Sequence, residues 1–383
     1  YQCILIFNRS WNDMVQTHVT DHSGLYLKFL HISFVKYLKA RLQLIRSKHA
    51  KFIEQVKDRL ENIFQHGIKD IRVLDRTFNH DIDRACRMLD IFARYAGKMR
   101  FHLEIHPSLI SERLKEKLAT LPSGLLHLEA GIQSLDADVL ALSGRKGSLE
   151  TSLAGLRYLT SLENVETHAD LIAGLPGYSL EMLVNDVSAL MSIGVDELQI
   201  ESLKVLPGTR MRNDAERLGL KYSPLPPYEI LQTAAMSPVE LRVAMQLSRT
   251  VDLYYNSEAW QTVTRRLICN YPKFLEAFTV HLKEMQVLDS PISLERRGVI
   301  LYEYCRTNYP EHVCDVSMAW ILAGFSLKKE PAGNVIKIKH CEEYLEEPCP
   351  TLRYYLYSSN DRQIIFGYDS ETHQPTPVYI KIQ

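Results

Sequence analysis

The chain has 383 residues, of which 46% are hydrophobic and 24% charged, and its length suits about two domains. This composition is that of a folded globular protein and excludes global disorder. Lys and Arg number 45 and Asp and Glu number 46, giving a formal net charge of −1. A balance this close to neutral gives no indication of a nucleic-acid or anionic-membrane partner, so neither is predicted.

Seven cysteines are scattered along the chain and form no CxxC pair and no ladder of the secreted, disulfide-rich kind. They are Cys3, Cys86, Cys269, Cys305, Cys314, Cys341 and Cys349. Such a set favours a reducing compartment and predicts a cytoplasmic protein. No run of about 18 apolar residues occurs, so no membrane span is predicted.

Residues 1–48 form an atypical N-terminal segment, and residues 1–24 show no clean period. Residues 25–45 mix apolar side chains with the basic residues Lys28, Lys36, Lys39 and Arg41, which is typical of a basic amphipathic helix. We expect this helix to pack on the domain; binding to a membrane surface is the less favoured alternative.

From residue 49 onward, helical and strand patterns alternate regularly. Helices are expected at 49–66, 81–95, 108–119, 135–142, 148–161, 179–192 and 209–218. Strands are expected at 71–75, 100–106, 125–130, 165–172 and 197–204. This alternation predicts βαβ units and a parallel sheet, with room for a sixth strand near the start. The sheet is either an open or partial α/β barrel or a doubly wound sheet.

The two faces of each strand separate these alternatives, because successive side chains point to opposite faces. His102, Glu104 and His106 share one face of their strand, and the opposite face is apolar. The matching polar positions on the later strands are His127, Glu129, Glu166, His168, Asp170, Gln199 and Glu201. Doubly wound strands are apolar on both faces, so the pattern predicts a barrel whose lumen is polar. Such a lumen holds a ligand or, alternatively, only a hydrogen-bonded polar core.

Polar and glycine-containing runs follow the carboxyl ends of these strands, where the sites of parallel barrels lie. The runs are VLDRTFN (73–79), LEAGIQS (128–134), DLIAGLPGYS (170–179) and LKVLPGTRMRNDAERLGLKY (203–222). Singly, each is consistent with an ordinary turn or helix cap. Together they resemble the radical S-adenosylmethionine enzymes, and more narrowly the cobalamin-binding type with a helical C-terminal extension, over about residues 50–260.

The resemblance implies an α/β fold, a partial TIM-like barrel of the radical S-adenosylmethionine type. We expect the barrel at 49–222, a helical C-terminal domain at 223–335 and a small antiparallel sheet at 336–383. Strands at 352–357, 362–366 and 378–382 indicate that sheet. In the helical part Tyr254, Tyr255 and Trp260 are expected in the core rather than in a substrate wall.

The resemblance also implies that the barrel binds S-adenosylmethionine beside a [4Fe–4S] cluster. The implied contacts fall in three groups: the amino-acid end, the ribose and carboxylate, and the adenine. In that order the residues are Asp75 and Asn79; Glu129, Gln133 and Ser134; and Ile172, Gly174, Leu203 and Val205. On this reading Gly174→Val abolishes binding of S-adenosylmethionine.

The sequence departs from the family at the cluster. The family holds its cluster with CxxxCxxC after the first strand, yet residues 1–50 contain only Cys3. No metal ligands are therefore assigned. Relatives often carry a cobalamin-binding domain before the barrel, and none is expected here, so cobalamin is implied only for the relatives.

Three functions remain open from the sequence. The first is a radical enzyme that needs an electron donor and acts on an unknown small-molecule or peptide substrate. The second is a degenerate, non-catalytic relative without the cluster. The third, from the residues alone, is a barrel metallohydrolase that uses the His102, Glu104 and His106 face, with His168 and Asp170, to hold zinc or manganese.

Overall fold

The structure is a computed structural model that describes residues 2–6, 19–20, 49–75, 77–145, 147–339, 352–358, 363–369 and 375–381. These residues form two compact units, Tyr1–Ala244 and Met245–Gln383. The helix predicted at 25–45 lies outside the described residues, as do Cys341 and Cys349. The four-part division of the chain at residues 48, 222 and 335 stays a prediction.

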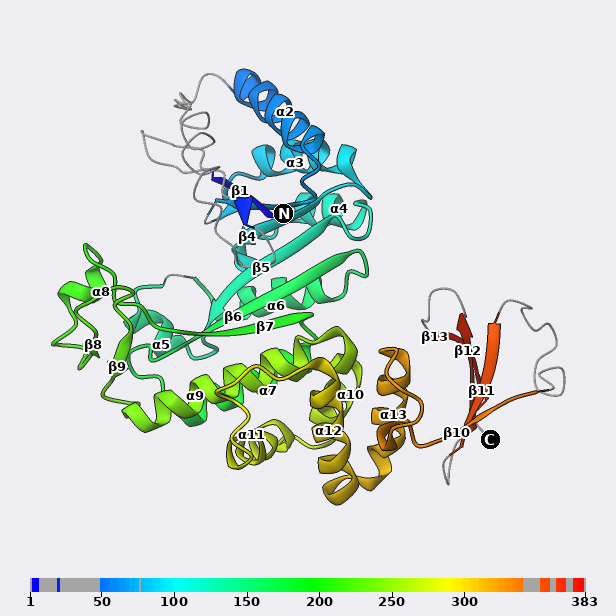
Figure 1. Ribbon diagram of the computed structural model, residues 1–383. Helices are drawn as coiled ribbons and strands as arrows, with labels where there is room; N and C mark the ends of the chain where they lie inside the picture. The colour runs from blue at the N-terminus through cyan, green and yellow to red at the C-terminus, as the bar shows by residue number, and fades with distance from the viewer. Residues whose placement is uncertain are drawn as a thin grey trace. The chain divides into compact units, whose positions relative to one another are not determined.

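The first unit is built on one seven-stranded sheet in the order β2-β1-β3-β4-β5-β6-β7 (Figure 1). Its strands are β1 (Gln2–Ile6), β2 (Val19–Thr20), β3 (Asp70–Leu74), β4 (Arg100–Ile105), β5 (Leu126–Gln133), β6 (Val165–Ala173) and β7 (Glu197–Ser202). All neighbours from β1 to β7 pair in parallel, and β2 alone runs antiparallel at the edge. The five predicted strands are confirmed, and β1 is the sixth parallel strand.

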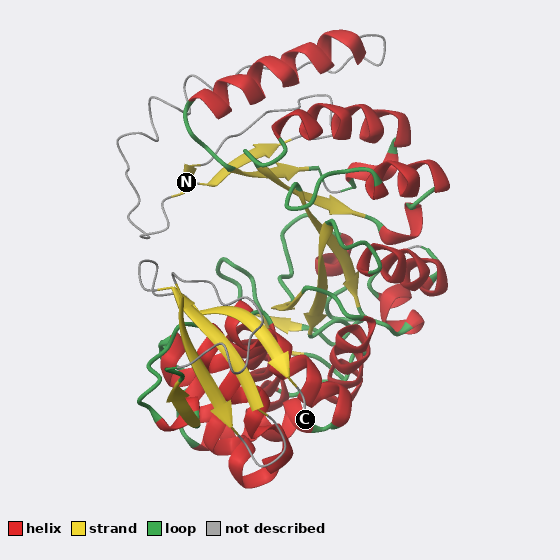
Figure 2. Ribbon diagram, turned by 90° about the vertical axis from the view of Figure 1, so that its right-hand side faces the viewer, coloured by secondary structure: helices red, strands yellow, loops and turns green. Residues whose placement is uncertain are grey.

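Helices connect the strands and gather along one side of the curved sheet, as Figure 2 shows. They are α2 (His49–Gln65), α3 (Ile82–Phe92), α4 (Glu112–Ala119), α5 (Ala137–Leu142), α6 (Leu149–Thr160), α7 (Leu180–Ile193) and α8 (Arg210–Asn213). Helices on one side only are the arrangement of an open barrel, and the predicted fold class is confirmed. The helix expected at 209–218 is shorter, because the chain leaves helical geometry after Asn213.

Local sequence explains where these helices begin. Side-chain oxygens of Asp81, Ser111, Ser148 and Ser179 accept backbone N–H groups at the starts of α3, α4, α6 and α7. Each such cap contributes about 1 kcal/mol by satisfying an otherwise unpaired amide. The four caps therefore define where these helices begin.

The core of the first unit lies between the helices and the apolar face of the sheet. Phe101 of β4 stacks on Phe92 of α3, with ring centroids 4.1 Å apart. α6 lies very close to the short 3-10 turn after β4 at Gly155, where an added Cβ would lie 2.0 Å from the carbonyl oxygen of Pro107. Only glycine fits there, so α6 packs directly against the end of β4.

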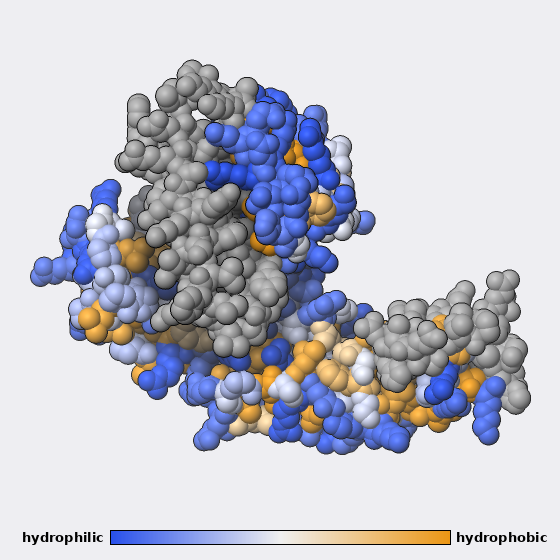
Figure 3. Space-filling view, turned by 45° about the horizontal axis from the view of Figure 1, so that its top comes forward, coloured by the Kyte–Doolittle hydropathy of each residue, from blue (hydrophilic) through white to orange (hydrophobic). Residues whose placement is uncertain are grey.

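Beyond β7 the first unit adds a two-stranded antiparallel sheet, β8 (Lys221–Tyr222) and β9 (Ile230–Gln232). α9 (Pro238–Thr250) then runs across the boundary between the two units. No helix among the described ranges is both long and apolar enough to cross a membrane. Hydrophilic side chains cover most of the described surface on the face drawn in Figure 3.

The second unit contains α10 (Glu258–Asn270), α11 (Phe274–Glu284), α12 (Leu294–Asn308) and α13 (Val313–Leu322). Tyr254, Tyr255 and Trp260 are fully buried, which confirms them as core residues. Gly298 lets α12 approach closely, because a Cβ there would lie 2.3 Å from the Trp260 ring. The predicted terminal sheet is confirmed in the order β10 (Asn334–Lys337), β11 (Leu352–Ser358), β12 (Gln363–Asp369) and β13 (Pro375–Lys381).

Candidate functional site

The sheet of the first unit carries one continuous polar face opposite its helices, as the strand patterns predict. The parallel register sets polar residues side by side: His102 lies beside His127, and Glu129 lies between Glu104 and His168. We define the polar face as His102, Glu104, His127, Glu129, Glu166, His168, Asp170, Glu197, Gln199 and Glu201. Strand pairing, rather than any single motif, brings these groups together.

At the carboxyl end of the polar face, Glu129 is half-buried in a cluster of charges. Its burial, followed by the nearby Asp170 carboxylate, raises the pKa of Glu129 to about 7. The guanidinium of Arg145, which follows α5, donates to the carbonyl oxygen of Gly131 and faces the Asp170 charge. Burial lowers the pKa of Arg145. A carboxyl group and a guanidinium of this kind can together recognise a ligand that carries both charges.

The backbone of β5 is irregular at this end. The pairing of β5 with β6 shifts between Gly131 and Gln133, and Gln133 has a φ of 71°. A positive φ is uncommon outside glycine and is held in place by the surrounding structure. The bulge re-aims the end of β5, as bulges beside sites often do.

Asp75 and Asn79 follow β3, and both are used inside the protein. The Asp75 carboxylate is paired with the Arg84 guanidinium, which also donates to the Phe78 carbonyl oxygen at 3.0 Å. The side-chain amide of Asn79 donates to the carbonyl oxygen of His106 at 2.9 Å and accepts the His106 N–H at 2.8 Å. Both side chains are therefore joined to the ends of neighbouring elements.

Ser134 follows β5 and is fully buried. Its hydroxyl donates to the Asp186 carboxylate at 3.1 Å and accepts the Asp136 N–H at 3.1 Å. The Tyr178 hydroxyl donates to the same Asp186 oxygen at 2.5 Å. Burial, and then the Asp186 charge, raises the pKa of Tyr178. This network joins the start of α5 to α7.

The residues that the resemblance assigns to adenine lie at the ends of β6 and β7. Ile172 is half-buried, and Leu203 and Val205 are buried. The Ile230 N–H donates to the Leu203 carbonyl oxygen at 2.8 Å, and the Val205 N–H donates to the Tyr228 carbonyl oxygen at 2.8 Å. The segment at 228–230 therefore already takes up the backbone groups assigned to adenine.

Gly174 is covered by the same part of the chain. It has a φ of 86°, and an added Cβ would lie 2.7 Å from Cγ2 of Ile230. Any side chain at this position meets protein atoms first. The prediction that Gly174→Val abolishes binding of S-adenosylmethionine stays a prediction, and the substitution would also disturb packing directly.

The metal set predicted on one strand is not supported. His102 stacks on His127 with ring centroids 4.4 Å apart, and His106 lies beyond β4 with its Nδ1 2.8 Å from the Ser108 hydroxyl. Burial, and then the His127 charge, lowers the pKa of His102 to about 3. Along one strand, residues four apart are separated by about 13 Å, so neighbouring strands approach one another far more closely.

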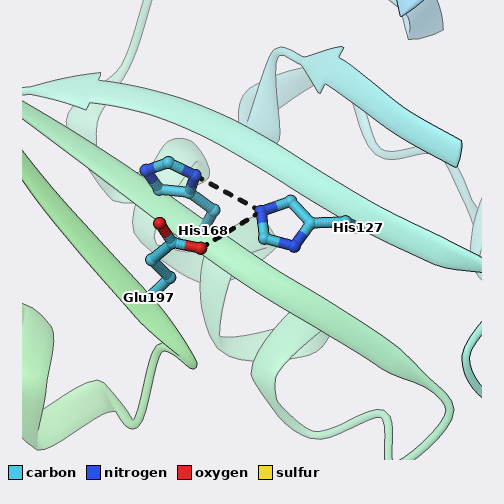
Figure 4. Close-up of side chains that lie close together, drawn as sticks. All are labelled: His127, His168 and Glu197. Carbon is cyan, nitrogen blue, oxygen red and sulfur yellow. Dashed lines mark hydrogen bonds and ion pairs between the residues drawn. The ribbon is translucent and has the colours of Figure 1, made fainter. Parts of the chain in front are cut away.

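Three side chains from neighbouring strands do converge on the polar face: His127 of β5, His168 of β6 and Glu197 of β7 (Figure 4). Their nitrogen and oxygen atoms all lie within 4.8 Å of one another. Among the described residues, no other group of three or more His, Cys, Asp or Glu side chains brings its possible ligand atoms this close together. The strand pattern placed His127 and His168 on this face but did not include Glu197, the first residue of its strand.

The cysteines whose side chains the structure describes do not fit an iron–sulfur cluster. The described thiols with side-chain detail are Cys86 in α3, Cys269 in α10, Cys305 in α12 and Cys314 in α13. Burial raises the pKa of Cys86, and burial raises the pKa of Cys305 to about 12. Residues 7–48, between β1 and α2, contain no cysteine. Because such clusters are held by thiolates, no step through a cluster can be derived for this chain.

Comparison with known proteins places the sheet in a family. The family model of the radical SAM superfamily matches residues 41–190. Residues 41–190 are a radical SAM domain. The match begins beyond β1 and covers β3 to β6. A second family model, described as a protein of unknown function (DUF4080), matches residues 216–321.

Individual relatives of this radical SAM domain are distant. A tRNA-2-methylthio-N(6)-dimethylallyladenosine synthase of Herpetosiphon aurantiacus is 25% identical over 167 residues, which are 41% of this chain and 38% of the relative. The synthase of the same name from Dehalococcoides mccartyi is 24% identical over 174 residues, 43% of this chain and 41% of the relative. The chain therefore spans well under half the length of the curated relatives that it matches.

Among solved structures, the radical S-adenosylmethionine methyltransferase TsrM from Kitasatospora setae is 19% identical. The match covers 49% of this chain and 38% of TsrM, with a TM-score of 0.39. TsrM has been solved with cobalamin and a [4Fe–4S] cluster bound. Those ligands belong to TsrM.

Proposed function

We propose that this chain binds S-adenosylmethionine at the carboxyl ends of β5 and β6. The observation that carries the proposal is the cluster of Glu129, Asp170 and Arg145 at one end of the polar face. S-adenosylmethionine presents a carboxylate, two positive charges and ribose hydroxyls. A guanidinium suits the carboxylate through paired hydrogen bonds, and carboxylates suit the remaining groups.

Three of the residues implied by the resemblance keep their roles in this proposal. Glu129 and Gln133 contact the ribose and carboxylate, and Ile172 packs on the adenine. Arg145 joins them as the partner of the ligand carboxylate. Its side chain lies beside His106 and Gly131 in a small pocket, close to the Asp170 charge.

The other implied residues receive different roles. We infer that Asp75, Asn79 and Ser134 are positioning residues, because their side chains bond within the protein. Gly174 and the backbone of 203–205 remain proposed neighbours of the adenine. Residues 228–230 already contact Gly174 and the backbone of 203–205. The adenine can therefore reach these groups only if it contacts them alongside residues 228–230.

Radical chemistry is the second part of the proposal and is separate from binding. In the family it requires a cluster and an electron donor, and residues 7–48 lack the thiolates. A relative that binds S-adenosylmethionine without forming a radical is the alternative that this absence favours. A small-molecule or peptide substrate and a cytoplasmic location are kept as predictions. The sequence predicts no nucleic-acid partner, but the curated relatives are named for tRNA modification. A binding assay with tRNA therefore tests that prediction.

Isothermal titration calorimetry of S-adenosylmethionine into the full chain tests binding. We expect Arg145→Ala to weaken it by about tenfold to 100-fold, the effect of losing hydrogen bonds between charged groups. Arg157→Ala, which removes an exposed arginine of α6, is the matched control and should leave the affinity unchanged. The absence of any binding to the wild-type chain would refute the proposal.

Anaerobic reconstitution with iron and sulfide tests the second part. The visible absorption typical of thiolate-bound iron–sulfur clusters would show that the chain acquires a cluster. We expect an iron-free, colourless protein, because residues 7–48 contain no cysteine and the cysteines described with their side chains lie on four separate helices. Calorimetry tests binding of S-adenosylmethionine, and reconstitution tests cluster formation. The chain could therefore bind S-adenosylmethionine even if it forms no cluster.

A further inference from the structure

His127, His168 and Glu197 meet on the polar face next to the proposed ligand cluster, because His168 pairs in register with Glu129. His127 is the second residue of β5, and Glu197 is the first residue of β7. Both histidine side chains are almost fully buried, at 5% and 3% exposed, whereas Glu197 is 44% exposed. The group thus has a buried side formed by the imidazoles and an accessible side at the carboxylate.

The distances between the nitrogen and oxygen atoms suit a shared ion. Nε2 of His127 lies 3.3 Å from Nδ1 of His168 and 3.6 Å from Oε2 of Glu197 (Figure 4). A tetrahedral zinc ion with bonds of about 2.0–2.1 Å places its ligand atoms about 3.3 Å apart. Two imidazole nitrogens and one carboxylate oxygen are a common zinc set that leaves a fourth position for water.

Each histidine also has a carboxylate at its other ring nitrogen. Oε2 of Glu166 lies 3.4 Å from Nδ1 of His127, and Oδ1 of Asp170 lies 2.9 Å from Nε2 of His168. Histidines that bind metals usually direct the second nitrogen at a carboxylate or carbonyl, which fixes the ring and makes the ligand more basic. The carboxylate is closer on His168 than on His127, and the presence of one near each ring favours a ligand pair over two isolated core histidines.

Arg100 influences which ring nitrogen of His127 carries the proton. Its guanidinium lies 2.8 Å from Nδ1 of His127 and is also paired with Glu166. With no ion bound, Arg100 can donate to Nδ1, which leaves the proton on Nε2. With an ion on Nε2, the proton belongs on Nδ1 and faces Glu166, so Arg100 must give up its contact with Nδ1 and keep only its pairing with that carboxylate.

We propose that His127, His168 and Glu197 bind one divalent zinc-type ion that ties β5, β6 and β7 together on the polar face. None of the three ligands is a residue that we assign to S-adenosylmethionine, but Asp170, which faces His168, belongs to the cluster proposed to bind it. Zinc binding is therefore measured without S-adenosylmethionine. The ligands come from adjacent strands, so the ion stabilises the register of the sheet. The partly exposed Glu197 leaves a route by which the ion enters.

Zinc titration of the metal-free full chain, in competition with a chromophoric chelator, tests the site. We expect one zinc ion per chain and a rise in thermal stability on binding, because an ion held only by the folded state stabilises it. His168→Ala and Glu197→Gln should each lose stoichiometric binding. Glu197→Gln nearly keeps the size of a half-exposed side chain, so its loss of zinc would not reflect misfolding. Glu166→Gln should weaken zinc binding by about 10–100-fold.

Two controls show whether the zinc is bound at this site or elsewhere, for example by an exposed histidine or by cysteines. His66→Ala removes an exposed histidine after α2 and should bind zinc as the wild type does. Cobalt substituted for zinc should give a spectrum without a thiolate-to-cobalt band. A wild-type chain that holds no stoichiometric zinc, a Glu197→Gln variant that binds normally, or a dominant thiolate band would each overturn the proposal.

Discussion

Asn79 holds the backbone of His106 in both directions, with its amide nitrogen 2.9 Å from the carbonyl oxygen and its amide oxygen 2.8 Å from the backbone nitrogen. The contact ties the turn after β3 to the residue that follows β4. The pairing of β3 with β4 reaches Val73 and Leu103, and this side chain adds two hydrogen bonds between the chain segments that follow the two strands. Asn79, which the family resemblance assigns to the cofactor, thus connects the segments that follow the carboxyl ends of β3 and β4.

Asn79→Ala should lower the free energy of unfolding by about 2–3 kcal/mol, because two buried backbone groups lose their partner. Urea denaturation followed by circular dichroism measures the change. Asn62→Ala, at an exposed position of α2, is the matched control and should change stability by less than about 0.5 kcal/mol. Equal effects of the two substitutions would show that the contact to His106 does not form.

Arg84→Met should cost about 3–5 kcal/mol, because it leaves the buried Asp75 carboxylate without its cation. Asp75 and Arg84 are 4% and 18% exposed. The exposed pair of Arg113 and Asp83, at 62% and 65%, provides the comparison. Arg113→Met should cost at most about 1 kcal/mol, since exposed pairs are screened by water. A similar loss in both variants in urea unfolding would contradict the burial of Asp75.

Gly174→Ala should destabilise the fold more than Gly194→Ala does. Both glycines have positive φ values, 86° and 89°, but only at Gly174 does a Cβ meet neighbouring atoms. The substitution at Gly194 therefore measures backbone strain alone, about 1 kcal/mol. Ile230→Ala combined with Gly174→Ala should recover part of the difference, because it removes the methyl group 2.7 Å away. Strict additivity of the two changes in thermal unfolding would argue against the contact.

Asp186→Asn should change the pH dependence of stability. Burial raises the pKa of Asp186, although bonds from the Leu135 amide, Tyr178 and Ser134 oppose the rise. A carboxyl group with a raised folded pKa stabilises the fold below its unfolded pKa, about 3.9, and that stability is lost as the pH rises through the folded value. The wild type should therefore gain stability relative to Asp186→Asn as the pH falls from neutrality toward about 4.

Asp214→Asn should show the opposite sign in the same pH series of urea unfolding. The side-chain bond from Arg217 lowers the pKa of Asp214. Its stabilisation is therefore present above the unfolded pKa and is lost on acidification through the folded value. Parallel pH profiles for the two variants would contradict the burial of Asp186.

The alternation of side chains was enough to predict much of the sheet. The strand expected at 100–106 is β4 at Arg100–Ile105, and the helix expected at 49–66 is α2 at His49–Gln65. β5 is longer than expected, because a bulge lets pairing continue past Gly131 to Gln133. Such a bulge depends on the neighbouring strand and leaves no periodic signal.

From the sequence, only the polar face of the sheet that carries the site could be predicted, and not the contacts within it. Glu129 and His168 were placed correctly on the polar side, yet Arg145 was missed because it lies in a loop outside every strand pattern. Ser134 was assigned to a ligand because a hydroxyl after a strand is suited to that role. Its partner, Asp186, lies 52 residues away in α7, and no local pattern reveals that contact.

The sequence by itself determined the order of strands and helices, the polar face and the absence of cysteines between residues 7 and 48. These follow from side-chain period and residue identity, which are local properties. The tertiary structure decided which polar groups meet: His127 with His168 and Glu197, Asn79 with His106, and segment 228–230 with the end of β7. Those contacts depend on strand register and on chain segments distant in sequence, and only packing fixes them.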